Sequence, residues 1–315
     1  MALVGKADMC RKRHISSSIV YNQYMSIESV EQERTHEIQM SPELQTALQL
    51  AKQAGEVLKK YHQTTLDVDY KKDEFDPVSV ADRESDELLR GGIAAAFPDD
   101  EILSEESPLQ PESYTGRVWM IDPLDDTKGY LRGEDTSSVM IGLLEAGKPK
   151  LGLVYLPFRG EYYYGEAGKG SFVVRNGQAI KLEAPDTTKI DGSRLVGRHV
   201  LAGDVRPVDE AVAKLGFGST VAEGSIGAKI GLIAEGKADA FIHTNLKAGK
   251  WDTLASEVIL SEAGGAPLVD IDGQPLDYAK TTSGWDRYFM AACTPELLQE
   301  MITKLGEINE QTRSF

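Results

Sequence analysis

Carboxylate side chains gather in four short segments, each next to an apolar stretch that predicts a helix or a strand. Mg²⁺ prefers oxygen ligands, and carboxylates from separate strand and helix ends suit two such ions. Taken singly, each segment is more often a helix cap or a solvated strand end. Their occurrence together, in order along the chain, favours a metal centre. The segments contain Asp82; Glu105 and Glu106; Asp122, Asp125 and Asp126 with Thr127; and Asp252.

The elements that must hold the first three segments are helices packed on an antiparallel sheet, over residues 41–184. Apolar residues at helical spacing predict one helix over residues 42–61 and a second over 81–97, which carries the first acidic segment. Short buried strands at 102–103 and 118–121 run directly into the next two. Further strands are predicted at 137–145, 151–156, 161–165 and 170–174.

From about residue 185 strands alternate with helices, which is typical of a layered α/β arrangement. The fold class is therefore α/β, with an N-terminal α+β subdomain over 41–184 and a C-terminal α/β subdomain over 185–315. Residues 1–40 are expected to be a disordered extension. Strands are predicted near 194–199, 218–222, 238–242, 266–270 and 289–292, and helices at 207–215, 225–235, 252–263 and after 294.

The formal net charge of the chain is −16. Such a field repels nucleic acid and anionic membranes, so neither is expected as a partner. It also repels phosphorylated small molecules, and a phosphate-handling enzyme this acidic would need metal cations to reverse the sign locally. The two cysteines, Cys10 and Cys293, lie near opposite ends of the chain. They indicate neither a disulfide framework nor a zinc site, and a reducing, cytoplasmic location is expected.

Three signatures resemble one family. Ser104-Glu105-Glu106-Ser107 is similar to Gly-Glu-Glu-Ser of the lithium-sensitive, magnesium-dependent phosphatases that include inositol monophosphatase and fructose-1,6-bisphosphatase. Asp122-Pro123-Leu124-Asp125-Asp126-Thr127 is similar to that family's Asp-Pro-Ile/Leu-Asp-Gly-Thr. Trp251-Asp252-Thr253-Leu254-Ala255 with Glu262-Ala263-Gly264-Gly265 is similar to its Trp-Asp-x-x-Ala … Glu-Ala-Gly-Gly. The resemblance covers about residues 42–305 and implies a layered α-β-α-β-α sandwich of the sugar-phosphatase type.

The segment from Thr127 to Glu134 resembles one branch of this superfamily. Its sequence, Thr-Lys-Gly-Tyr-Leu-Arg-Gly-Glu, is similar to that of the 3′(2′),5′-bisphosphate nucleotidases. This resemblance implies removal of the 3′-phosphate from adenosine 3′,5′-bisphosphate and from its sulfated precursor in sulfate assimilation. A broader inositol-phosphate or sugar-phosphate phosphatase is the alternative, because His243-Thr244 lies where some nucleotidases carry an arginine.

The family resemblance also implies roles for individual residues. The metal ligands would be Glu105, Asp122, Asp125 and Asp252, with the carbonyl of Leu124, holding two or three Mg²⁺ ions. Thr127 paired with Asp82 would orient and deprotonate the attacking water, with Glu105 also in the catalytic set. The small-molecule phosphorylated substrate would meet Asp126, Lys128, Gly224, Ser225 and Lys229, and the protein would be a monomer or homodimer.

Two of these positions have alternative interpretations. Asp126 replaces the glycine of the family pattern, so its carboxylate would repel the substrate, extend the metal site or cap a helix. Ser225 is equally a nucleotide contact or a helix cap. Asp126 also motivates a hypothesis of a different class: a catalytically degenerate relative that binds metal or a partner protein.

Overall fold

The computed structural model describes residues 40–62, 68–70, 77–197 and 207–312. The extension predicted for residues 1–40 lies outside the described residues, except for residue 40. The end of the strand predicted at 194–199 also lies outside them. Residues Pro42–Phe315 form one compact unit. Within the described residues, the strands form a seven-stranded, a five-stranded and a two-stranded sheet.

The seven-stranded sheet has the order β3-β4-β5-β6-β7-β8-β9 and is antiparallel except for the parallel pair β3–β4. Its central strands are almost continuously buried because helices cover both faces, which explains their unbroken apolar sequences. The strands are β3 (Glu101–Ser104), β4 (Arg117–Asp125), β5 (Ser138–Glu145), β6 (Lys148–Leu156), β7 (Glu161–Glu166), β8 (Gly170–Arg175) and β9 (Gln178–Lys181).

The outer face of this sheet is covered by α3 (Pro42–Tyr61) and α4 (Val80–Ala96). Ser79 caps α4, and Asp82 in its first turn bonds back to the Ser79 backbone. This capping box fixes where the helix begins. The small hairpin of β1 (Val68–Tyr70) and β2 (Pro77–Ser79) leads into it.

The five-stranded sheet has the order β11-β10-β12-β14-β13. Strands β11, β10 and β12 are parallel, and β14 lies antiparallel between β12 and β13. The strands are β10 (Arg194–Gly197), β11 (Ser219–Ala222), β12 (Ala240–His243), β13 (Val269–Asp270) and β14 (Phe289–Ala292).

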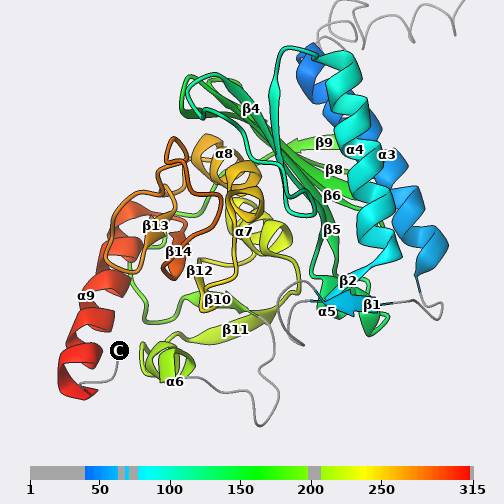
Figure 1. Ribbon diagram of the computed structural model, residues 1–315. Helices are drawn as coiled ribbons and strands as arrows, with labels where there is room; N and C mark the ends of the chain where they lie inside the picture. Colours follow the sequence, from blue (N-terminus) through cyan, green and yellow to red (C-terminus); the bar gives the residue numbers. More distant parts are fainter. Residues whose placement is uncertain (1–39, 63–67, 71–76, 198–206, 313–315) are drawn as a thin grey trace, which may run out of the picture. The chain divides into compact units, whose positions relative to one another are not determined.

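The remaining helices complete an α-β-α-β-α sandwich (Figure 1), which confirms the predicted fold class. Helices α7 (Ile226–Ala234) and α8 (Leu254–Glu262) pack on the inner face of the large sheet, and α7 also contacts β10 and β12. Helix α9 (Pro295–Thr312) packs on β14, and α6 (Pro207–Ala213) packs on α9. No helix in the described part of the chain is both long and apolar enough to cross a membrane.

Helix α8 lies unusually close to the large sheet. A Cβ atom on Gly152 of β6 would overlap the backbone of Ala255, and one on Gly142 of β5 would overlap the Leu254 side chain. These glycines let the first turn of α8 rest on the sheet. The 3₁₀ turn Lys250–Asp252 (η1), which precedes α8, is thereby brought against β4.

Candidate active site

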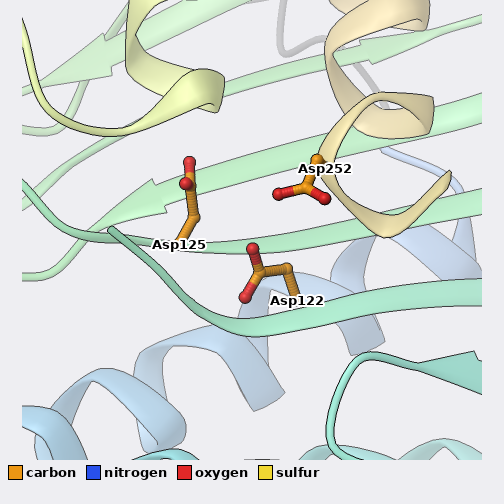
Figure 2. A group of neighbouring side chains, drawn as sticks. All are labelled: Asp122, Asp125 and Asp252. Carbon is orange, nitrogen blue, oxygen red and sulfur yellow. The ribbon is translucent and has the colours of Figure 1, made fainter. Parts of the chain in front are cut away.

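Three buried carboxylates converge between β4 and the start of α8. Asp122 and Asp125 come from β4 and Asp252 from η1, and their side chains point toward one another (Figure 2). One oxygen from each lies within 4.8 Å of the others. The three side chains are at most 9% exposed.

An irregularity in β4 allows one strand to supply two of these carboxylates. Successive side chains of a regular strand alternate between faces, so residues three apart point to opposite sides. The pairing of β4 with β5 shifts register between Asp122 and Asp125. The Leu124 N–H turns back to the Asp122 carboxylate at 2.9 Å, and the Pro123 carbonyl accepts from the Ser85 hydroxyl at 3.1 Å. The sequence predicted a strand ending before Asp122, whereas β4 continues to Asp125.

Asp252 is fixed by its own turn. One of its carboxylate oxygens accepts the Gly249 N–H at 2.6 Å. The predicted helix at 252–263 begins instead at Leu254, after the 3₁₀ turn.

Glu105 joins the cluster through the parallel pairing of β3 with β4. Ser104 pairs with Ile121, and the Glu105 N–H donates to the Ile121 carbonyl at 3.1 Å, so Glu105 follows β3 beside Asp122. Its charge and hydrogen bond act on Asp122. Four predicted metal ligands therefore lie in one neighbourhood.

The electrostatics of this cluster favour a bound cation. Burial, followed by the charges of Glu105, Asp125 and Asp252, raises the pKa of Asp122 well above its usual range. Burial also raises the pKa of Asp125, against the opposing hydrogen bond from Ser225 and the charge of Lys229. Ionised carboxylates that are buried this close together are unfavourable without a counter-charge. The set is all-oxygen and acidic, which fits Mg²⁺.

Asp125 is also held by the start of helix α7, which contacts both sheets. Its carboxylate accepts the Ser225 hydroxyl at 2.6 Å and the Gly227 N–H at 3.1 Å. Ser225 caps α7, and Ser138 of β5 lies 2.8 Å from its hydroxyl. The buried Lys229 ammonium donates to the Gly224 carbonyl at 2.6 Å.

The predicted water-activating pair lies next to the cluster. The Thr127 hydroxyl is 3.2 Å from one oxygen of Asp82 and 3.1 Å from the Leu124 carbonyl. The other oxygen of Asp82 accepts both the N–H and the hydroxyl of Ser79, at 2.7 and 2.5 Å. Ser79 thus holds Asp82 so that its remaining oxygen faces Thr127.

Asp126 acts as a helix cap. Its carboxylate accepts the Gly129 N–H at 3.0 Å, at the start of α5 (Thr127–Leu131), and the Thr136 hydroxyl at 2.8 Å. A Cβ atom at Gly224 would overlap this carboxylate. The predicted contacts Asp126 and Gly224 are therefore neighbours, while the Lys128 side chain is exposed.

The sequence interpretation missed several residues that hold the site. Ser79 has a detectable signal, since serine three residues before an acid is typical of a capping box. Ser138 and Thr136 carry no such signal, because each meets its partner only through the fold. Gly249 meets Asp252 within one local turn, but through its backbone N–H, which any residue except proline supplies.

The chain is similar to known phosphatases over most of its length. The sequence model described as the inositol monophosphatase family matches residues 39–309. The 3′(2′),5′-bisphosphate nucleotidase CysQ of Aggregatibacter actinomycetemcomitans is 34% identical over 80% of this chain and 93% of its own. The histidinol-phosphatase of Chlorobaculum parvum is 35% identical over 78% of this chain and 95% of its own.

Solved structures of the same family share the fold. The Thermotoga maritima IMPase superposes with a TM-score of 0.72 at 23% identity, covering 86% of this chain and 99% of its own. The inositol monophosphatase from Anabaena superposes with a TM-score of 0.67 at 26% identity, covering 84% and 95%.

Proposed function

Because this chain belongs to the inositol monophosphatase family and is a metal-dependent phosphomonoesterase, we propose that it removes the 3′-phosphate of adenosine 3′,5′-bisphosphate. The proposal rests on the segment Thr127–Glu134, which resembles the bisphosphate nucleotidases. This segment begins two residues after Asp125 of the carboxylate cluster. The CysQ relative at 34% identity supports it. The sulfated precursor of this nucleotide is proposed as a further substrate.

We propose that Glu105, Asp122, Asp125 and Asp252, with the Leu124 carbonyl, hold two or three Mg²⁺ ions. The convergence of three buried carboxylates and the raised pKa of Asp122 support this ligand set. Bound Mg²⁺ would supply positive charge that draws a phosphate group to an acidic site and makes water easier to deprotonate.

Thr127 and Asp82 are proposed to move the proton of the attacking water. The Thr127 hydroxyl accepts the water's proton and passes its own to the nearby oxygen of Asp82. The two hydrogen bonds from Ser79 keep Asp82 in place during this transfer. The water oxygen then attacks phosphorus, the bond from phosphorus to the 3′-oxygen breaks, and the released alcohol takes up a proton.

The five proposed substrate contacts divide into two groups. The Lys128 side chain is exposed and follows Thr127 in the chain, close to Asp126 and its neighbour Gly224. Ser225 and Lys229 are buried and bond to Asp125 and Gly224. We therefore propose that Ser225 and Lys229 shape the substrate site indirectly, by holding Asp125 and Gly224 in place. A cytoplasmic location and a monomer or homodimer remain part of the proposal.

A phosphate-release panel tests the substrate. Adenosine 3′,5′-bisphosphate, inositol 1-phosphate, fructose 1,6-bisphosphate and histidinol phosphate would be compared with Mg²⁺, with and without Li⁺. The histidinol-phosphatase relative at 35% identity makes its substrate the second candidate. Equal or slower turnover of the nucleotide would contradict the proposal. Loss of all turnover in Asp252→Asn would separate this enzyme from a binding-only relative.

A further inference from the structure

One buried cation has no part in the proposed reaction. Lys250 begins the turn that ends in Asp252, and its side chain is fully buried. Burial of an ammonium group is costly unless hydrogen bonds replace the water that it loses. Its position next to the metal cluster therefore needs a structural reason.

The Lys250 ammonium is satisfied by three groups from two other segments. It donates to the Tyr278 carbonyl at 2.8 Å and to the Lys280 carbonyl. It also lies 3.7 Å from the centre of the Tyr114 ring, which is a close cation–π contact. All three partners lie outside the turn that carries Lys250.

The two segments have different relations to the cluster. Tyr114 belongs to the connection from β3 to β4, which starts with Glu105. Tyr278 and Lys280 belong to the connection from β13 to β14. That second connection also pairs with the chain before Asp252, since the Lys250 N–H donates to Ser283 and the Trp285 N–H to Ala248, both at 2.9 Å.

We propose that Lys250 is a positioning residue of the metal centre. Its ammonium ties the turn that carries Asp252 to the connection that begins with Glu105, and so fixes the separation of these two carboxylates. The inference rests on the proposed metal site and not on the identity of the phosphate ester. Loss of a group that hydrogen-bonds a metal ligand commonly weakens metal binding about 10-fold or more. Lys250 acts one step further away, through the turn that carries Asp252, so an effect at the lower end of this range is expected.

Lys250→Met tests this role, because methionine keeps an unbranched stem and removes the charge and the donors. Mg²⁺ binding is measured by titration calorimetry at a temperature where circular dichroism shows full folding. The expected Kd for Mg²⁺ is about 10-fold higher than in the wild type, while kcat at saturating Mg²⁺ falls less than about 3-fold. An unchanged Kd in the folded variant would overturn the proposal.

Arg175→Met is the matched control for lost stability. Arg175 binds Glu235 at the end of α7 opposite to Ser225, so it braces the fold away from the cluster. This variant should lose thermal stability and keep the wild-type Kd for Mg²⁺. A parallel rise in Kd would show that loss of another bonded cation has the same effect and would overturn a specific role for Lys250.

Tyr114 provides a second pair of variants if Lys250→Met does not fold. Its buried hydroxyl has no hydrogen-bond partner among the described residues, so Tyr114→Phe keeps the ring face at little cost. Tyr114→Leu removes that face. The expected Kd for Mg²⁺ is about 3-fold higher in the leucine variant than in the phenylalanine variant. Equal Kd values in the two Tyr114 variants would contradict the proposal. A wild-type protein that binds Mg²⁺ without preferring nucleotides would contradict only the proposed substrate.

Discussion

Asp126 occupies a backbone conformation that normally favours glycine. Its φ of 74° lies in the left-handed region, which costs an L-residue about 1 kcal/mol. Aspartate tolerates this region better than most residues, and its carboxylate gains the Gly129 N–H and the Thr136 hydroxyl. The family glycine has therefore been replaced by a residue that links α5 to the segment before β5, while Gly224 leaves room for it.

Asp126→Gly should lower kcat/KM about 3-fold to 10-fold, because both hydrogen bonds are lost and the turn beside Thr127 loosens. Loss of the cap should also cost about 1 kcal/mol of stability, partly offset by relief of the backbone. Asp126→Asn is the control, since asparagine keeps an acceptor oxygen and tolerates the left-handed region. Steady-state kinetics and urea denaturation measure both effects. A higher kcat/KM in the glycine variant would show that the carboxylate repels the substrate.

Asp82→Asn should lower kcat by a factor of about 10² to 10³, because Thr127 can no longer pass its proton to a carboxylate. The Kd for Mg²⁺ should change little, since Asp82 is not among the proposed ligands. Asp86→Asn is the matched control: this buried carboxylate lies one turn further along α4 and bonds Arg90 and Ser104. The control should lose stability with a kcat close to wild type. An equal loss of kcat in both variants would contradict the proton-transfer role.

Most elements around the site could be predicted from sequence, because covered strands and amphipathic helices leave clear patterns. The end of β4 could not. Asp122 and Asp125 are charged, so the pattern ended the strand before them, whereas pairing with β5 continues to Asp125. Strand β9 and the β1–β2 hairpin were also missed, since β9 is exposed throughout and both are short.

Gly152→Ala should show how strongly the site depends on the close packing of α8. The new methyl group would overlap the Ala255 backbone, so α8 and the Asp252 turn must shift. Stability should fall by about 1–3 kcal/mol, and the Kd for Mg²⁺ should rise. Gly91→Ala is the control, because this exposed position in α4 has open space around it and should gain up to about 1 kcal/mol. Thermal unfolding and calorimetry give both quantities, and a wild-type Kd in the Gly152 variant would contradict this dependence.

At the scale of the molecule, the sequence predicted an α+β half and an α/β half with site residues in both, but not the contacts that hold those residues together. Lys250 illustrates the reason. A lysine beside Trp251 is typical of a solvated turn, and its burial depends on carbonyl groups of residues 278 and 280. The insertion of β14 between β12 and β13 is likewise a property of long-range pairing, which local sequence patterns do not encode.

The stability of the whole molecule should depend on pH through Glu257 of α8. Burial raises its pKa from 4.5 to about 7, although its carboxylate accepts the Leu268 N–H at 2.9 Å. A raised pKa means that the folded state holds the proton more tightly. The stability associated with it is therefore complete below about pH 4.5 and is lost as pH rises to about 7.

Glu257→Gln should remove this loss, because glutamine stays neutral and keeps an acceptor for Leu268. The free energy of unfolding should exceed that of the wild type by about 3 kcal/mol at pH 8 and by little at pH 5. Urea denaturation at both values measures the difference. Exposed Glu307→Gln changes the net charge equally and should show no such dependence. A constant difference between Glu257→Gln and wild type across pH would contradict the titration.

The pairing that holds the Asp252 turn has a consequence for synthesis of the chain. The backbone of residues 248–250 bonds to residues 283–285, which follow it in the sequence. As the nascent chain leaves the ribosome, the carboxylates of β4 emerge first and can settle into the large sheet. The turn with Asp252 gains its partners only when the connection before β14 has also emerged. Until then Asp122 and Asp125 lack Asp252, so a ribosome-bound chain should acquire tight Mg²⁺ binding only after residues 283–285 have emerged.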